Sequence, residues 1–166
     1  MRLSNGDTVR TVKAKSVWID SRYDTAAGAR DMAALDIMET FQNPKPVAFI
    51  EDILRLGAHA DGLILDFFAG SGTTAQAVLE LNAKDGGHRK FILVQLPEPT
   101  GREDYPTIAD ITKERVRRVI KKLGTDDGFR VFKLAESNFT AWDSLRRHSK
   151  PSHPCQRKAG HARRVS

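Results

Sequence analysis

Apolar residues along this chain follow two patterns that predict different secondary structures. A spacing of three or four residues is typical of helices, whereas an unbroken apolar run is typical of a strand covered on both faces. The helical spacing predicts helices over 31–41, over 47–57 after Pro46, from 73 to the Lys-Asp-Gly-Gly turn at 84–87, and over 108–123. The unbroken runs predict strands at 63–68 and 91–96.

Three further segments complete the predicted order of elements. Residues 12–20 alternate loosely and predict a strand, residues 21–30 predict a polar loop, and residues 129–134 predict a third strand of the main sheet. Thr107 and Asp110 have capping-box spacing and predict the start of the last helix. The alternation of helices and strands predicts the α/β class, as a partial doubly wound sheet with about three strands.

A glycine-rich loop joins the strand at 63–68 to the helix that starts at Thr73. Without a Cβ, Gly70 and Gly72 let the backbone adopt left-handed angles and approach a ligand, and the helix start offers N–H groups to an anion. Two readings stay open: a ligand loop with the dinucleotide pattern G-x-G-x-x-A, or a plain tight turn. Asp66 favours the first, because a carboxylate ending a buried strand needs a partner. The lack of a lysine after Gly72 excludes a Walker phosphate loop.

Length and composition narrow the class of protein. A chain of 166 residues, 40% apolar and 29% charged, corresponds to a soluble globular protein of about one domain. No apolar stretch reaches the roughly 18–20 residues of a membrane span, and residues 1–10 lack a signal-peptide core, so we expect a cytoplasmic protein without a membrane partner. The single cysteine, Cys155, excludes an internal disulfide and a cysteine-based zinc site, and we expect no metal.

The net charge of +6 is concentrated at the C-terminus. Residues 1–143 carry 20 Lys and Arg against 21 Asp and Glu, whereas residues 144–166 carry 7 Lys and Arg and no acidic residue. This basic segment has no apolar period, so we predict a disordered tail. It is read as a solvated tail, as read-through into an unnatural frame, or as a DNA-binding arm. The charge therefore does not identify a function.

The glycine loop and its surroundings resemble a known family. The sequence Asp-Phe-Phe-Ala-Gly-Ser-Gly-Thr-Thr at 66–74 resembles the S-adenosylmethionine-binding motif of DNA amino-methyltransferases whose binding motif follows their catalytic motif. Asn-Pro-Lys-Pro at 43–46 resembles the lysine-proline motif that precedes it. The stretch at 89–98 and the helix after it are similar to modification subunits of type III restriction systems, which are adenine-specific.

The resemblance implies a set of cofactor-binding residues and a Rossmann-like methyltransferase sheet. The methionine part of S-adenosylmethionine would lie against the glycine loop, with its amino group near Asp66 and its carboxylate near Lys45 and Pro46. Gln95 stands where relatives carry an acid that holds the ribose, and Glu98 lies three residues later. The implied set is Lys45, Pro46, Asp66, Phe68, Ala69, Gly70, Ser71, Gly72, Thr73, Gln95 and Glu98.

The family's catalytic motif is absent from this sequence. Members carry an Asp-Pro-Pro-Tyr type motif that holds the target amino group and stacks on a flipped base, and no Asp, Asn or Ser here precedes Pro-Pro and an aromatic residue. We therefore expect no catalytic residue in this chain, and no methyl transfer by the chain alone. The implied partners are an N-terminal catalytic and target-recognition part, double-stranded DNA through the complete enzyme, and a restriction subunit.

These expectations divide the chain into three parts. Residues 1–30 would end a target-recognition region, residues 31–143 would form the S-adenosylmethionine-binding subdomain, and residues 144–166 would be the tail. The free edge of the strand at 63–68 would pair with the missing part. A nucleotide-binding oxidoreductase fragment and a non-catalytic basic DNA-binding remnant stay open as alternatives.

Overall fold

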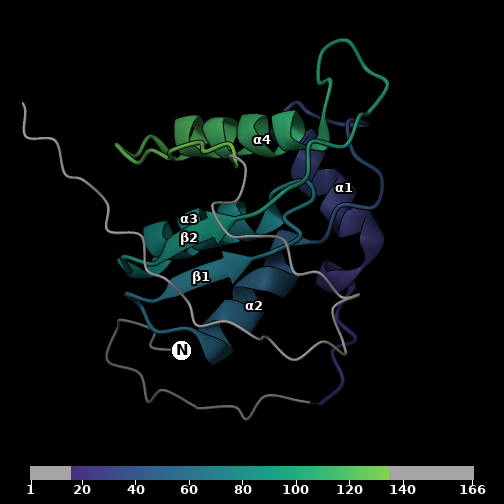
Figure 1. Cartoon of the computed structure of the whole chain (residues 1–166). Helices are drawn as coiled ribbons and strands as arrows, with labels where there is room; N and C mark the ends of the chain where they lie inside the picture. Colours follow the sequence, from purple (N-terminus) through teal and green to yellow (C-terminus); the bar gives the residue numbers. More distant parts are fainter. Residues whose placement is uncertain (1–15, 135–166) are drawn as a thin grey trace, which may run out of the picture. The chain divides into compact units, whose positions relative to one another are not determined.

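The computed structural model describes residues 16–134, and within residues 16–129 helices pack on a small parallel sheet (Figure 1). In chain order the elements are η1 (Ser21–Tyr23), α1 (Thr25–Ala33), α2 (Val47–Gly57), β1 (Leu63–Asp66), α3 (Thr73–Asp85), β2 (Lys90–Leu93) and α4 (Ile108–Leu123). Residues 130–134 belong to a second unit of the chain. The predicted α/β class is therefore confirmed within residues 16–129.

Strands β1 and β2 are parallel neighbours connected through α3. Their register aligns Asp66 with Leu93, and the N–H of Val94 donates to the Asp66 carbonyl at 2.8 Å just beyond it. The predicted strands at 63–68 and 91–96 are thus confirmed in position, although each regular strand has 4 residues. The shorter β1 places the start of the glycine loop directly at its carboxyl end.

The predicted helices corresponding to α2, α3 and α4 are confirmed, and side-chain caps fix two of their starts. The carboxylate of Asp31 in α1 accepts the N–H of Val47 at 2.7 Å, which ties the start of α2 to α1. Thr107 and Asp110 form the predicted capping box at the start of α4. None of the helices within residues 16–134 is long and apolar enough to span a membrane.

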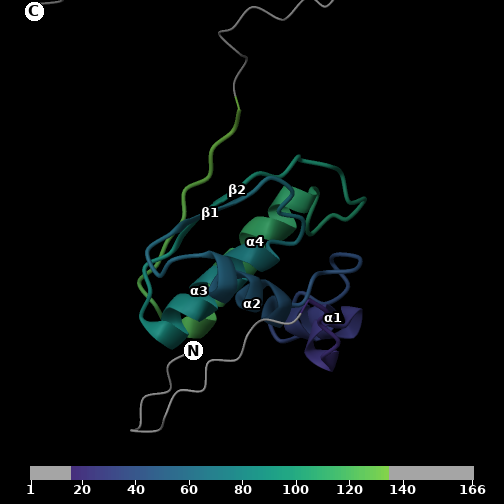
Figure 2. The same cartoon turned by 90° about the horizontal axis from the view of Figure 1, so that it is seen from below.

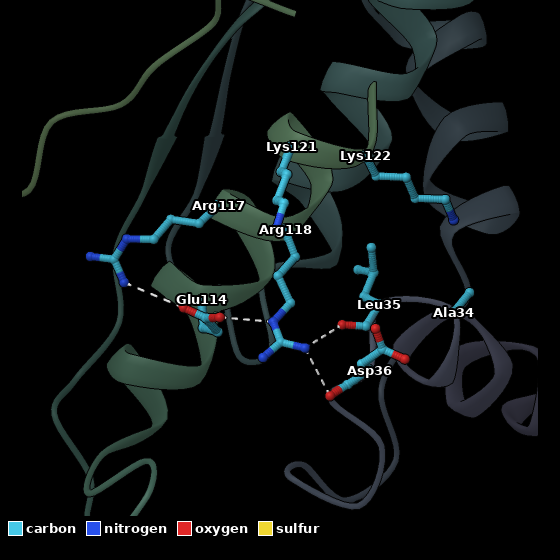
Figure 3. Close-up of a pocket in the computed structure, with 8 residues that line it drawn as sticks. All are labelled: Ala34, Leu35, Asp36, Glu114, Arg117, Arg118, Lys121 and Lys122. Carbon is cyan, nitrogen blue, oxygen red and sulfur yellow. Dashed lines mark hydrogen bonds and ion pairs between the residues drawn. The ribbon is translucent and has the colours of Figure 1, made fainter. Parts of the chain in front are cut away.

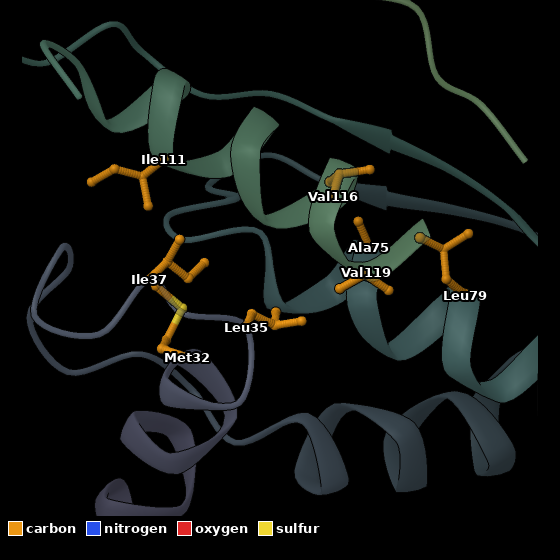
Figure 4. Close-up of a cluster of buried hydrophobic side chains, with 8 residues drawn as sticks. All are labelled: Met32, Leu35, Ile37, Ala75, Leu79, Ile111, Val116 and Val119. Carbon is orange, nitrogen blue, oxygen red and sulfur yellow. The ribbon is translucent and has the colours of Figure 1, made fainter. Parts of the chain in front are cut away.

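Two hydrophobic clusters fill the space between the sheet and the helices. The larger one joins α1 and the segment after it to α3 and α4 (Figure 4), and contains Met32, Leu35, Ile37, Ala75, Leu79, Ile111, Val116 and Val119. The smaller one lies between α2 and α3 and contains Val47, Leu54, Ala77, Val78 and Leu81. Phe91 of β2 packs against both clusters. Helix α3 is therefore the central helix, and the glycine loop at its start rests on the core.

Among residues 16–129 the sheet is covered on one face only, because α2, α3 and α4 all lie on the same side of it (Figure 2). Burial alternates along both strands: Ile64 and Phe91 are partly buried, whereas Leu65 and Ile92 are exposed. The prediction that these strands are covered on both faces is therefore wrong for the described residues. The unbroken apolar runs instead give the sheet a second apolar face.

Two local predictions in the first third of the chain are wrong. Residues 21–30 hold η1 and most of α1 in place of a loop, because the carboxylates of Asp20 and Asp24 cap both helices. The helix predicted over 31–41 ends at Ala33. Its apolar residues still reach the core, but they do so from an irregular segment in which Asp36 has a φ of +55°.

Predicted strands near the two ends of the described range are also wrong. Residues 16–20 and 129–134 are irregular, and the only ladder among the described residues pairs β1 with β2. An extended segment without a paired neighbour has no ladder hydrogen bonds, so it does not form a strand. Residues 12–15 and the predicted tail at 144–166 lie outside the described residues.

Candidate functional site

The glycine loop leaves the carboxyl end of β1 and leads directly into α3. Gly70 and Gly72 have φ values of +52° and +84°, in the left-handed region that favours glycine. A Cβ on Gly70 would lie 3.3 Å from Cζ of Phe41, and one on Gly72 would lie 3.1 Å from Cγ2 of Thr112. The backbone conformation therefore favours glycine at both positions, and a Cβ there would in addition lie in tight contact with Phe41 or Thr112, a packing feature that the sequence did not reveal.

Hydrogen bonds hold the loop from β2 and from α4. The Gly70 N–H donates to Oε1 of Gln95 at 2.7 Å, and the Gly70 carbonyl accepts the Thr112 hydroxyl at 2.6 Å. Within the loop, the Gly72 N–H donates to the carbonyl of Ala69 at 2.8 Å. These contacts fix the loop, so the first turn of α3, whose N–H groups lack intrahelical partners, starts from a fixed position.

Arg115 of α4 is a buried cation beneath the loop. It is 0% exposed, and burial lowers its pKa to about 10, so the guanidinium is charged at neutral pH. Its Nη1 donates to the hydroxyls of Ser71 at 2.7 Å and Thr73 at 2.9 Å. Its Nε donates to Oε1 of Gln76 at 2.7 Å, while Nη2 has no hydrogen-bond partner among the described residues. Arg115 thus connects the end of the loop with the first turns of α3.

Sequence reasoning missed this role of Arg115, although the sequence contains a signal for it. Arg115 follows Ile111 by four residues and precedes Val119 by four, so it falls within the apolar stripe of α4. A cation in such a stripe needs buried polar partners. Ser71 and Thr73, both in the predicted set, supply them with their hydroxyls, so what they can offer a ligand is mainly their backbone.

Asp66 ends β1 with its carboxylate turned toward the loop. Oδ1 accepts the N–H of Phe68 at 3.0 Å, and Oδ2 accepts the Thr74 hydroxyl at 2.6 Å. The chain thus supplies two of the hydrogen-bond donors that a partly buried carboxylate requires. Each oxygen has a second lone pair, so the half-buried carboxylate can still accept a donor from a cationic ligand.

The Lys45–Pro46 segment lies beside the loop. The Thr73 hydroxyl donates to the Lys45 carbonyl at 3.2 Å, and the Lys45 side chain is exposed. Pro46 is buried and is the N-cap of α2. A Cβ on Gly28 of α1 would lie 1.9 Å from the Pro44 carbonyl oxygen, so α1 packs directly on this segment. The structure therefore brings the two motifs noted in the sequence into contact.

Three residues of the predicted set, Gln95, Phe68 and Glu98, differ in whether they contact the glycine loop. Gln95 supports the loop through Oε1, and its Nε2 donates to the Leu96 carbonyl at 3.1 Å. Phe68 is 88% exposed, which leaves its ring open to a ligand or a partner. Glu98 has an exposed side chain, and its carbonyl accepts the N–H of Ile108 at 2.9 Å at the start of α4. Glu98 therefore belongs to the connection between β2 and α4.

A separate cleft of about 650 Å³ lies between α4 and the segment after α1 (Figure 3). Its basic side chains are those of Arg117, Arg118, Lys121 and Lys122. Nη1 of Arg118 donates to the carbonyls of Leu35 at 2.8 Å and Asp36 at 2.9 Å, and its Nε donates to Glu114 at 2.8 Å. Arg118 therefore holds the irregular segment on α4. The cleft contains none of the residues predicted to bind a cofactor.

Comparison with known proteins gives consistent matches. The EcoPI Mod subunit, a type III restriction-modification enzyme subunit of Escherichia phage P1, is 42% identical over 121 residues, which are 69% of this chain and 19% of the subunit. The StyLTI Mod subunit of Salmonella typhimurium is 37% identical over 139 residues, which are 76% of this chain and 21% of that subunit. The type II methyltransferase M.KpnI of Klebsiella pneumoniae is 36% identical over 116 residues, covering 66% of this chain and 28% of that enzyme.

The chain thus spans between about a fifth and just over a quarter of the length of these three relatives. A family model described as DNA methylase matches residues 3–129. This match includes the glycine loop, the Lys45–Pro46 segment and Arg115. The chain therefore belongs to the DNA methylase family, within which it resembles the Mod subunits of type III restriction-modification enzymes.

Proposed function

We propose that this chain forms the S-adenosylmethionine-binding part of an adenine-specific DNA methyltransferase in a restriction-modification system. The observation that carries the proposal is the fixed glycine loop between β1 and α3, with Asp66 before it and Lys45 beside it. In a parallel α/β sheet, ligands bind outside the carboxyl ends of the strands, which is where this loop lies. The complete enzyme would have a doubly wound, Rossmann-like sheet.

The residues around the loop fit the chemistry of S-adenosylmethionine. Its ammonium group would donate hydrogen bonds to a carboxylate, and Asp66 has lone pairs that are not used by its two hydrogen bonds to Phe68 and Thr74. Its carboxylate would be attracted by the exposed Lys45 ammonium and by the N–H groups of the first turn of α3. Phe68 would add an apolar wall. The side-chain amide of Gln95 is used within the chain, where it bonds the Gly70 N–H and the Leu96 carbonyl. Glu98, three residues later, would therefore be the acid that binds a ribose hydroxyl.

The residues of this chain would contribute to methyl transfer by positioning. When bound, S-adenosylmethionine would supply an electrophilic methyl group, and the amino nitrogen of a flipped adenine would attack it directly. The attack needs the nitrogen in line with the sulfonium carbon, so a rigid loop has a direct effect on rate. Arg115 and Thr112 would keep the loop rigid from the side of α4.

Another part of the enzyme would recognise the DNA site and bind the flipped adenine. The aligned segment is 19% of the EcoPI Mod subunit, 21% of the StyLTI Mod subunit and 28% of M.KpnI, and this chain contains no Asp-Pro-Pro-Tyr type motif. That part would contact double-stranded DNA, and a restriction subunit would be a further partner. By itself, this chain would bind cofactor and transfer no methyl group.

Titration calorimetry with S-adenosylmethionine and with NAD tests this proposal. Binding of S-adenosylmethionine in preference to NAD supports it, and a preference for NAD would support an oxidoreductase fragment instead. Fluorescence anisotropy with duplex DNA at several salt concentrations covers the remaining alternative. Salt-sensitive DNA binding that no cofactor changes would point to a basic DNA-binding remnant.

A further inference from the structure

The start of α2, next to the Lys45–Pro46 segment, is capped by a residue from another helix. Pro46 is the N-cap of α2 and makes no side-chain cap hydrogen bond. The first N–H of α2, that of Val47, instead donates to Oδ2 of Asp31 at 2.7 Å. Asp31 lies in α1, which is beside the start of α2 (Figure 1). A carboxylate 16 positions earlier in the chain therefore fixes where α2 begins.

A second contact holds the same segment on the glycine loop. The Thr73 hydroxyl donates to the Lys45 carbonyl at 3.2 Å, and Nη1 of Arg115 donates to that hydroxyl at 2.9 Å. Only Pro46 lies between this carbonyl and the N–H that Asp31 binds, and its ring restricts φ, which is −65° here. The two contacts together give the backbone of Lys45 a defined position relative to the glycine loop.

The charge of Asp31 is also coupled to the cation beneath the loop. Asp31 is half-buried, and burial raises its pKa, whereas the Val47 N–H and the charge of Arg115 lower it. Glu80 of α3 raises the pKa of Asp31 as well, and Arg30 lowers it. Asp31 in turn opposes the fall in the pKa of Arg115 that burial causes. Asp31 and Arg115 therefore stabilise each other's charged form between α1 and α4.

A comparison with Asp24 shows what is unusual about this cap. Oδ1 of Asp24 accepts the N–H of Ala27 at 2.7 Å, so Asp24 caps α1 from the position directly before that helix. Such a cap stabilises the helix that it belongs to. Asp31 makes a bond of the same length to a different helix, so it fixes one element of the candidate site against another.

We propose that Asp31 is a positioning residue of the cofactor site, which holds the Lys45–Pro46 segment against the glycine loop so that the Lys45 ammonium reaches the cofactor carboxylate. This proposal rests on the proposed function and adds a residue outside the predicted set. Asp31 acts through the start of α2 and makes no contact with the cofactor. A segment held in place before binding does not have to be ordered when the ligand arrives, and this raises affinity.

Titration calorimetry of the full 166-residue chain with S-adenosylmethionine tests the proposal. Asp31→Ala removes the acceptor, and we expect it to weaken binding about tenfold because the segment is then ordered only on binding. Asp31→Asn keeps an oxygen that can accept the Val47 N–H, so its affinity should return to within about threefold of wild type. In a Lys45→Ala background, Asp31→Ala should weaken binding by less than about threefold, because the ammonium that it positions is already absent.

Asp24→Ala is the matched control, because it removes a carboxylate cap of the same 2.7 Å length that does not involve the Lys45–Pro46 segment. Both alanine variants should lower Tm, and only Asp31→Ala should lose affinity. Wild-type affinity in Asp31→Ala, or an equal loss of affinity in Asp24→Ala, would leave Asp31 a merely stabilising role and overturn the proposal. A failure of Asp31→Asn to restore binding would also overturn it.

Hydrogen exchange measured by NMR tests the proposal on the wild-type chain, without cofactor and without a variant that has to fold. The first N–H of a helix has no partner within the helix and normally exchanges fast. If Asp31 holds it, the Val47 N–H should exchange as slowly as the interior of α2, and fast exchange would overturn the proposal. Failure of the wild-type chain to bind S-adenosylmethionine would overturn the proposed function, and the exchange rate would still show whether Asp31 holds the segment.

Discussion

Replacement of Arg115 by methionine is the perturbation whose outcome the structure constrains best. Methionine has a similar length and no charge, so Arg115→Met removes the guanidinium and leaves little cavity. Three hydrogen bonds are lost, to Gln76, Ser71 and Thr73. The hydroxyls of Ser71 and Thr73 lie 3.4 Å apart and can bond to each other, whereas Oε1 of Gln76 loses its only described donor.

The expected change in the free energy of unfolding is the difference between two opposing effects. Hydrogen bonds to a charged group contribute about 1.5–3 kcal/mol each, so three amount to about 5–9 kcal/mol. Burial of the cation costs several kcal/mol, and the variant no longer incurs that cost. The net loss of stability is therefore about 2–4 kcal/mol, or a fall in Tm of about 10 °C for a unit of this size.

Thermal unfolding followed by circular dichroism measures this change. Arg117→Met is the control, because Arg117 lies on the same helix with its side chain 58% exposed and paired to Glu114 at 3.6 Å. Exposed pairs contribute little, so the control should stay within about 0.5 kcal/mol of wild type. If Arg115→Met were as stable as this control, Arg115 would not be what holds the glycine loop rigid.

Three further predictions address the loop, α4 and activity. Gly72→Val should abolish S-adenosylmethionine binding in calorimetry because φ is +84° there, and Lys45→Ala should weaken it by about 1–2 kcal/mol, so unchanged affinity in both would contradict the site. The neighbours Lys113 and Thr107 lower the pKa of Asp110 to about 2, so α4 should lose stability as pH falls from about 4 to about 2, and Asp110→Asn should flatten that dependence in acid melting curves. In a tritiated-methyl assay the chain alone should not label DNA; robust incorporation would mean that it holds catalytic residues.

The sequence predicts elements whose signals are local and strong. The helices α2 and α4 follow from apolar spacing, and the capping box at Thr107 and Asp110 is present as predicted. The prediction failed where tertiary contacts replace helical hydrogen bonds. After Ala33, the carbonyls of Leu35 and Asp36 bind Arg118, which lies more than 80 residues later.

The sequence predicted where the candidate site lies in the chain, but it did not predict which residues contact one another within the site. Glycine spacing after an apolar run located the loop and Asp66. It did not reveal that Gln95 supports the loop or that Ser71 faces Arg115, because those contacts join residues 25 and 44 positions apart. The prediction that both faces of the sheet are covered failed for another reason. An unbroken apolar run indicates that both faces of a strand are apolar, but it does not indicate which segment of chain covers each face.

Photolabelling shows directly whether the cofactor binds at the glycine loop. The chain is irradiated with radioactive S-adenosylmethionine, with and without excess S-adenosylhomocysteine, and digested with trypsin. No lysine or arginine lies between Arg55 and Lys84, so the loop lies in one tryptic peptide. If the cofactor binds at the glycine loop, competable label will appear in that peptide. Competable label found only in peptides from the α4 cleft at 117–122, or label that the competitor does not reduce, would contradict it.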